Sequence, residues 1–212
     1  MQNNNKVAVL GGTGKSGRFL VRQLVNSAIP VRVLFRNPSA LQFTHPLIEW
    51  IQGDARDPES VYELINGCQS VISALGQPKG EPSIFSDATR NVIRAMYLLR
   101  IKRYIVTTGL NVDTILDNKS NYSASATAWM KANYPETTAD KQLEWKILCL
   151  SKLDWTLVRL PLIDLTEQES GVKTSLVDCP GEKISATSLA GFLVGQLDDK
   201  TYLKKSPFLA NG

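Results

Sequence analysis

Residues Val7–Leu20 read VAVLGGTGKSGRFL, and this stretch decides the fold. It opens with a short apolar run rich in β-branched residues, which is typical of a buried parallel strand. Glycines then come at positions 11, 14 and 17, and the apolar residues after them recur at helical spacing: Phe19, Leu20 and Leu24. The stretch therefore predicts a strand, a glycine-rich turn and a helix in succession.

Each of the three glycines suits a dinucleotide site. Gly11 permits the tight turn off the strand, Gly14 lets the backbone approach a pyrophosphate, and Gly17 lets the helix pack against the strand. The free N–H groups and the macrodipole at the helix start favour two phosphates. Because the motif lies between a strand and a helix, it predicts a dinucleotide site, the alternative being a plain strand-to-helix turn.

The composition indicates one globular domain over residues 1–212. A chain of 212 residues with 43% hydrophobic residues can bury a substantial core, and residues from about 160 to 212 are expected to form a small C-terminal lobe. The net charge of +4 comes from scattered basic residues, so a nucleic-acid partner is not expected. We expect a small-molecule substrate, and a monomer or a weak homodimer.

The cysteines and the hydropathy pattern predict a cytoplasmic protein. Cys68, Cys149 and Cys179 are widely spaced and form no CxxC pair, so we expect reduced thiols, two of them buried. With His45 as the only histidine, no metal site is predicted. The segment 1–6 is too short and polar for a signal peptide, and no apolar run approaches the roughly 20 residues of a membrane span.

Strand-like and helical segments alternate along the rest of the chain, in units too long for hairpins. The predicted strands are 30–35, 48–54, 70–75, 103–108 and 155–160. The predicted helices are a short one capped by Asp57 that stops at Gly67, then 84–99 and 138–151; a strand at 172–177, a helix at 188–197 and a strand at 207–209 follow. This order predicts an α/β fold, a Rossmann-like doubly wound parallel sheet with a small C-terminal substrate lobe.

Residues 110–134 are polar and weakly periodic. We expect a long excursion over the carboxyl edge of the sheet. Loops of such length in compact domains are usually functional or mobile.

The spacing Gly11-x-x-Gly14-x-x-Gly17 resembles that of extended and atypical short-chain dehydrogenases/reductases. Further matches run along nearly the whole chain: Gly53-Asp54, Ala74–Gly76, Ala88–Ile93, and Ser151–Pro161, the last similar to a stretch in the NAD(P)-binding group that includes NmrA-like proteins and biliverdin reductase B. The combination is specific for the superfamily and much less so for one reaction. Together with the glycine motif, the resemblance implies these cofactor-binding residues: Gly11, Thr13, Gly14, Lys15, Ser16, Gly17, Arg36, Asp54, Ala55, Ala74, Leu75, Gly76, Thr107, Lys141 and Pro161.

The end of the second predicted strand favours NADP(H) over NAD(H). NAD enzymes of this architecture carry an acidic residue there, which binds the ribose hydroxyls. Here the strand ends in Arg36-Asn37, nineteen residues past Gly17. The Arg36 guanidinium can pair with a 2′-phosphate, and Lys15 can add a second positive charge. The alternative is that both are solvated surface cations.

The catalytic residues of the wider superfamily are only partly present. Its Tyr-x-x-x-Lys pair and the hydroxyl after the fifth strand imply Lys141 and Thr108 as catalytic candidates. However, Thr137 stands at the tyrosine position, and the hydroxyl position falls on Gly109. Thr108 is equally well explained as a strand residue, and Lys141 as part of a solvated helix face.

Other charged residues on the same helix have a plainer interpretation. Asp140 directly precedes Lys141, and Glu144 lies three residues after it. We expect them to form helix-surface pairs, which usually contribute little.

Two functions fit this pattern. The first is an NADPH-dependent reductase resembling biliverdin reductase B, which passes hydride to a planar acceptor such as a flavin or quinone and can take its proton from water. The second is a non-catalytic, NADP(H)-sensing regulatory protein of NmrA-like type, favoured by the missing tyrosine and hydroxyl. An isomerase or epimerase is disfavoured by the same absences. We favour the reductase.

Overall fold

The alternating segments assemble around one sheet in a computed structural model that describes residues 6–40 and 44–212. The strands lie in this order: β3 (Ile48–Gln52), β2 (Val31–Phe35), β1 (Val7–Leu10), β4 (Ser70–Ser73), β5 (Arg103–Gly109), β6 (Asp154–Leu160), β10 (Phe208–Asn211) and β8 (Val172–Ser175). Neighbouring strands are parallel except β8, which runs antiparallel to β10. The predicted doubly wound α/β fold is confirmed.

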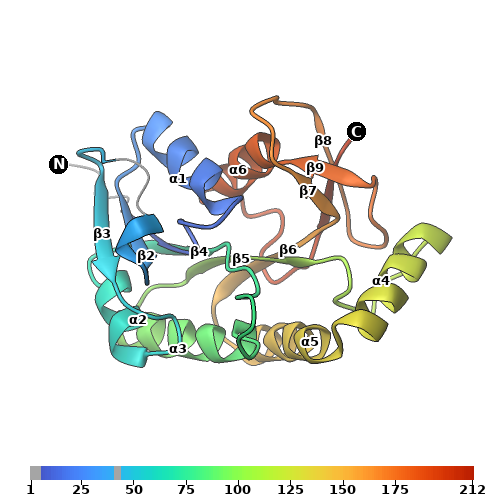
Figure 1. The fold of residues 1–212 in the computed structure, drawn as a ribbon, viewed down its shortest axis with the longest axis horizontal. Helices are drawn as coiled ribbons and strands as arrows, with labels where there is room; N and C mark the ends of the chain where they lie inside the picture. Colours follow the sequence, from blue (N-terminus) through green and yellow to red (C-terminus); the bar gives the residue numbers. More distant parts are fainter. Residues whose placement is uncertain (1–5, 41–43) are drawn as a thin grey trace.

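Helices cover both faces of the sheet (Figure 1). One face carries α1 (Gly17–Asn26) and α6 (Ala186–Gly195), and the other carries α2 (Pro58–Ile65), α3 (Phe85–Leu98) and α5 (Pro135–Leu150). Alternate residues of β1 enter the two resulting cores: Ala8 and Leu10 pack toward α2 and α3, whereas Val7 and Val9 pack toward α1. Burial on both faces explains why this strand is apolar throughout.

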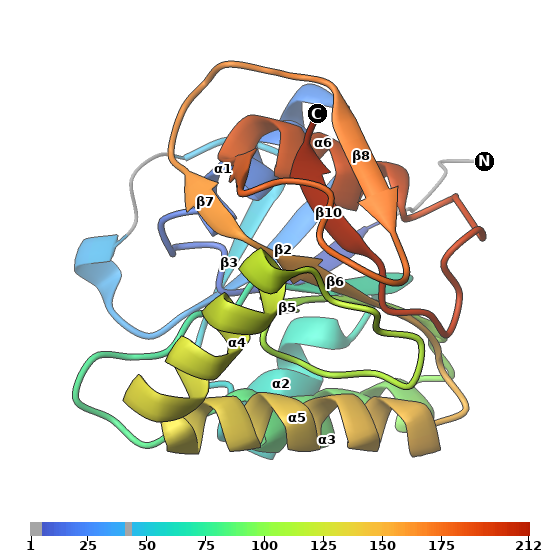
Figure 2. The same cartoon turned by 90° about the vertical axis from the view of Figure 1, so that its right-hand side faces the viewer.

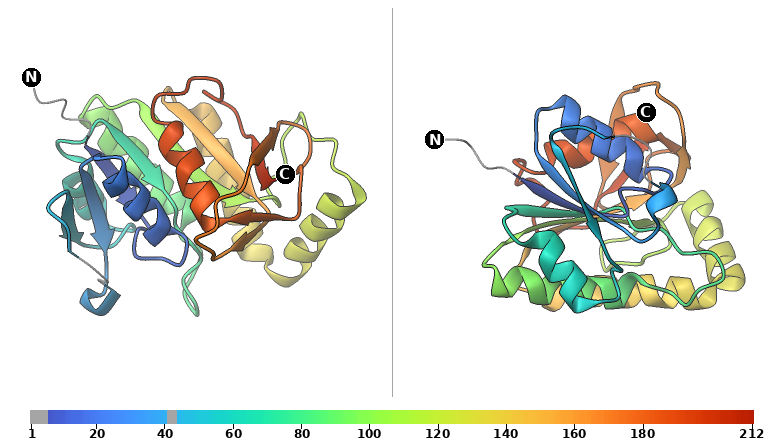
Figure 3. Two further views of the ribbon diagram at one scale, coloured as in Figure 1. Left: turned by 90° about the horizontal axis from the view of Figure 1, so that it is seen from above. Right: turned by 60° about the vertical axis from the view of Figure 1, so that its left-hand side comes forward.

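The C-terminal part joins the main sheet more closely than the sequence indicates. β10 and β8 extend the central sheet, and α6 lies beside α1 on the same face (Figure 3). A separate two-stranded parallel sheet, β7 (Leu162–Asp164) with β9 (Lys183–Ser185), was not predicted. α6 starts two residues earlier than expected because the Ser185 side chain caps it by accepting from the Ser188 N–H.

The segment expected to be a loop, 110–134, contains a helix, α4 (Asn121–Asn133). Ser120 caps this helix by accepting from the Ser123 N–H. Only Ser123 and Thr127 of α4 are buried, and both are polar, so no apolar periodicity announces the helix. α4 stands at the right-hand end of the molecule in Figure 1, and Figure 2 shows it rising obliquely from α5 in front of the strands.

Three further observations concern the thiols, the cap of α2 and the hydropathy of the helices. Cys68 and Cys179 are buried and Cys149 is exposed, and all three are free thiols, as expected. Asp57 caps α2, accepting from the N–H groups of Glu59 and Ser60. No helix in residues 6–40 and 44–212 is both long and apolar enough to cross a bilayer.

Candidate functional site: a cavity above the glycine-rich turn

A cavity of about 570 Å³ opens at the carboxyl edge of the sheet. Its walls come from the segments that follow β1, β2, β3 and β4. It lies beside β1, where the strand order reverses: β2 and β3 lie on one side of β1, and β4, β5 and β6 lie on the other. Such a switch point is the usual ligand site of a doubly wound sheet.

Most of the predicted cofactor-binding residues meet in this cavity. Eleven of them line it: Gly11, Thr13, Gly14, Lys15, Ser16, Arg36, Asp54, Ala55, Ala74, Leu75 and Gly76. Gly17 is buried behind the turn, while Thr107, Lys141 and Pro161 are not among the lining residues. The loop after β4 contributes further lining residues that the sequence did not indicate: Gln77, Pro78 and Ile84.

Close backbone contacts explain the glycines at the two ends of the turn. Gly11 has φ +77°, and a Cβ there would lie 2.5 Å from the Ala74 carbonyl oxygen. A Cβ on Gly17 would overlap the Gly11 carbonyl. Both positions therefore require glycine, which brings the start of α1 against the turn and the turn against the end of β4.

The start of α1 has the donors that an anionic group needs. The Ser16 side chain makes no capping hydrogen bond, and the first turn holds no acidic residue. The neighbouring Lys15 is exposed. Free N–H groups, the positive end of the helix dipole and a nearby ammonium together fit the pyrophosphate of a dinucleotide.

An ionic cluster of four side chains (Arg36, Arg56, Asp54 and Glu81) lies at the cavity; Arg36 and Asp54 line it, and Arg56 and Glu81 are paired with them. Arg36 Nη1 donates to both carboxylate oxygens of Glu81, at 3.0 and 2.9 Å, and lies 3.6 Å from Asp54. Arg56 Nη1 donates to Glu81 at 3.0 Å. The hydrogen bond from Arg36 is the main reason that the pKa of Glu81 is lowered from its ordinary value. Arg36 is thus no isolated surface cation, and Arg56 and Glu81 were missed because nothing local links them to it.

Helix α5 presents Asp140 and Glu144 inward, which corrects the expectation of helix-surface pairs. Asp140 accepts from the Ser83 hydroxyl at 2.6 Å and from the Phe85 N–H at 2.8 Å, so it caps α3. Glu144 is buried, with only 2% of its surface exposed, and accepts from the Thr89 hydroxyl at 2.7 Å. Burial raises the pKa of Glu144 to about 8.

Lys141 lies between Phe85 and the end of β5, and is half-buried rather than solvated. Its ammonium is 4.7 Å from the centre of the Phe85 ring, and burial lowers the pKa of Lys141. A Cβ on Gly109 would lie 3.7 Å from this ammonium and would collide with the side-chain oxygen of Asn111. The Asn111 amide therefore occupies the space beside Gly109, a residue that no sequence motif indicated.

The two threonines of β5 differ in their surroundings. Thr107 donates its hydroxyl to the Ser73 carbonyl at 3.3 Å. Thr108 is buried, and its hydroxyl oxygen has no partner among the described residues. Pro161, directly after β6, is buried. Lys141 of α5 and Asn111 thus lie beside the end of β5 at Gly109.

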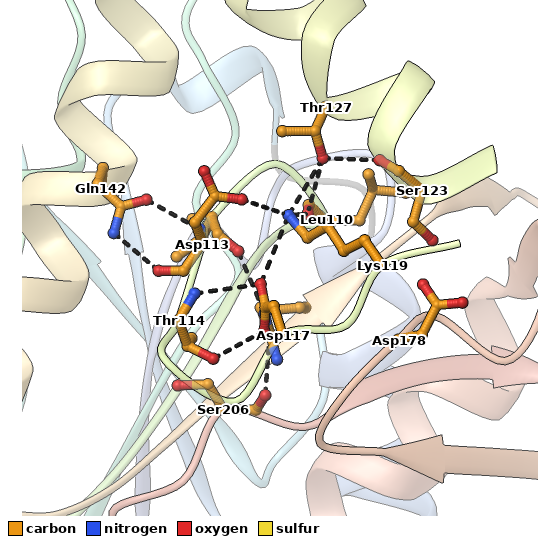
Figure 4. Close-up of polar contacts among 12 residues, drawn as sticks. Leu110, Asp113, Thr114, Asp117, Lys119, Ser123, Thr127, Gln142, Asp178 and Ser206 are labelled. Atoms are coloured by element: carbon orange, nitrogen blue, oxygen red, sulfur yellow. Dashed lines mark hydrogen bonds and ion pairs between the residues drawn. The ribbon is translucent and has the colours of Figure 1, made fainter. Parts of the chain in front are cut away.

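The segment after β5 is held in place by ion pairs and hydrogen bonds around Lys119 and Asp113 (Figure 4). The Lys119 ammonium donates to Asp113 at 2.6 Å, the Leu110 carbonyl at 2.9 Å and the Thr127 hydroxyl at 3.1 Å. Gln142 of α5 donates to the Asp113 carbonyl and accepts from its N–H, both at 2.9 Å. These contacts tie residues 110–119 to both α4 and α5.

Arg159 of β6 binds the same segment from the central sheet. It is completely buried and donates to Asp117 at 2.6 Å and to the Ser206 carbonyl at 2.9 Å. Its guanidinium also lies 3.5 Å from the centre of the Phe208 ring. Arg159 therefore joins β6, β10 and the segment after β5.

Comparison with known proteins agrees with a dinucleotide site. A family model described as NAD(P)H-binding matches residues 11–200. Among curated proteins, the photosystem II assembly factor Ycf39 of Cyanophora paradoxa is 30% identical over 113 residues, covering 50% of this chain and 34% of that protein. The chain spans only 34–39% of the length of the first curated relatives it matches.

Two solved structures share the fold over nearly the whole chain. One is a short-chain dehydrogenase/reductase from Veillonella parvula in complex with NADP, with a TM-score of 0.80, 14% identity and 98% and 94% of the two chains covered. The other is the anaerobillin reductase ChuY from Escherichia coli O157:H7, with a TM-score of 0.81, 18% identity and 97% of each chain covered. These two structures share the fold, and since the family model matches most of the chain, the protein belongs to the NAD(P)H-binding family.

Proposed function

We propose that this protein is an NADP(H)-dependent reductase that transfers hydride from NADPH to a small planar acceptor of the flavin or quinone class. The observation that carries the proposal is the guanidinium of Arg36, which lines the cavity above the glycine-rich turn, with a second guanidinium, Arg56, joined to it through Glu81. The strand β2 is followed by Arg36-Asn37, without the carboxylate typical of NAD sites.

Different residues along the cavity suit different parts of the cofactor. The start of α1, with Thr13 to Ser16, suits the pyrophosphate, and Arg36 with Arg56 suits a 2′-phosphate. Ala74, Leu75 and Gly76 form the wall after β4 and would orient the rest of the cofactor toward the end of β5. NADPH, when bound, supplies the hydride, and the protein supplies orientation and exclusion of water.

The residues near the end of β5 suit an acceptor that needs little help with its proton. Lys141 holds a proton at Nζ beside Gly109, and its lowered pKa makes it a better acid than an ordinary lysine. Asn111 is buried and donates its amide to the Thr138 hydroxyl, so its position is fixed. A planar acceptor that takes hydride can accept its proton from water or from Lys141 without a tyrosine.

The first test is a titration of the purified protein with NADPH and NADH, monitored by tryptophan fluorescence. The second measures NADPH oxidation at 340 nm with flavins and quinones as acceptors. Tight NADPH binding with turnover supports the reductase. Absence of binding would mean that the glycine-rich turn serves only as a turn.

The second candidate is an NADP(H)-sensing protein without catalysis. Thr137 at the tyrosine position and Asn111 filling the space beside Gly109 favour it. In that case NADPH binds tightly and no acceptor is turned over. The cytoplasmic location and the monomeric or weakly dimeric state remain predictions.

A further inference from the structure

Glu81 holds the two arginines of the ionic cluster together. Its carboxylate accepts two hydrogen bonds from Arg36 and one from Arg56, all between 2.9 and 3.0 Å. The three side chains are only partly exposed, at 46% for Arg36, 30% for Arg56 and 38% for Glu81. The carboxylate thus takes the donors that a phosphate in this part of the cavity would use.

The loop between β4 and α3 keeps Glu81 in this position. The Gln77 side chain donates to the Glu81 carbonyl at 2.9 Å, and Arg56 Nη2 donates to the Pro82 carbonyl at 2.8 Å. One residue further on, Ser83 is bound to Asp140 of α5. Since the backbone is held on both sides, the pairing is part of the local fold rather than a chance contact of a solvated side chain.

The charges of the cluster balance while Glu81 is paired. Arg36 and Arg56 carry two positive charges, and Glu81 with Asp54 carries two negative ones. A phosphate monoester brings a charge of about −1.5 to −2 at neutral pH. Such a group meets a neutral cluster unless Glu81 moves away. A ribose with a free 2′-hydroxyl meets instead a carboxylate that can accept its hydrogen bond, as the missing residue after β2 would.

We infer that Glu81 is a specificity-determining residue, a carboxylate from the β4–α3 loop that occupies the 2′-phosphate subsite and must be displaced from Arg36 and Arg56 before NADP(H) binds. The inference rests on the proposed function. Glu81 therefore weakens binding of NADP(H) relative to NAD(H). The preference of the protein for NADP(H) over NAD(H) is therefore smaller than Arg36 and Arg56 would give without Glu81.

The test measures binding rather than turnover. Dissociation constants for NADPH, NADH, 2′,5′-ADP and 5′-ADP are compared in the wild type, in Glu81→Gln and in Glu169→Gln. Glu169 is an exposed glutamate outside the cavity, so its variant controls for the change in net charge. The pair of ADP ligands isolates the 2′-phosphate from the nicotinamide half.

For Glu81→Gln we expect NADPH and 2′,5′-ADP to bind about tenfold more tightly, and NADH and 5′-ADP to bind equally or more weakly. The factor is modest because each exposed ion pair contributes little free energy, and the substitution removes two of them. Glu169→Gln should behave as the wild type. If the wild type binds NADPH and Glu81→Gln shows the same preference, the inference about Glu81 is wrong and the proposed function stands. If the wild type binds none of the four ligands, both are wrong.

Discussion

Replacing Glu144 by glutamine should make the stability of the protein less dependent on pH. The buried carboxyl has a pKa of about 8 against an ordinary 4.5, so between these values it keeps its proton in the folded protein while the unfolded chain has lost it. Unfolding then releases a proton, and the free energy of unfolding falls as pH rises. Each pH unit in this window is worth about 1.4 kcal/mol per group, and the whole window about 5 kcal/mol.

Glutamine has the shape of the protonated acid and still accepts from the Thr89 hydroxyl, but it cannot ionise. We therefore expect Glu144→Gln to differ little from the wild type at pH 4.5 and to be more stable by about 4 kcal/mol at pH 7.5. Urea unfolding at both pH values measures the difference. Glu136→Gln, an exposed change on the same helix, is the control. A stability difference that does not change with pH would refute a protonated Glu144.

Three further changes test other parts of the structure. Arg36→Asp should weaken NADPH binding much more than NADH binding in parallel titrations, and equal losses would contradict the 2′-phosphate role. Asp117→Asn removes the charge that faces buried Arg159 and should cost about 3 kcal/mol in urea unfolding; an effect below about 1 kcal/mol would mean that the Arg159 charge is compensated by other groups. Gly17→Ala places a methyl group against the Gly11 carbonyl, and we expect a loss of about 2 kcal/mol in thermal or urea unfolding together with impaired NADPH binding. Unchanged binding would show that the turn adapts.

The fold was predictable where local pattern and tertiary packing agree. The strand, turn and helix of residues 7–26 are an example, because β1 is buried on both faces and the glycines are required by close backbone contacts. α4 was missed for the opposite reason: its buried residues, Ser123 and Thr127, are small and polar. Helix periodicity is visible in a sequence only when the buried face is apolar.

The site was predictable only in part. The residues of the turn and those directly after β2 and β4 could be located because parallel strands bring their carboxyl ends to one edge. Glu81 could not be foreseen beside Arg36, since 45 residues separate them and only the loop after β4 brings them together. Asp140 and Glu144 fit a solvated helix face equally well until the packing of α5 against α3 is known.

The arrangement around Arg159 has a consequence for the order of folding. Its guanidinium pairs with Asp117, which precedes β6 in the chain. It also donates to the Ser206 carbonyl and stacks on Phe208, about fifty residues further along the chain. Until that later segment arrives, β6 would bury a cation that has Asp117 but lacks the Ser206 carbonyl and the Phe208 ring, which is unfavourable. β6 and β10 should therefore dock in one concerted late step. Amide hydrogens of these two strands should exchange with the solvent through a common opening event, separate from that of the β1–β2–β3 half.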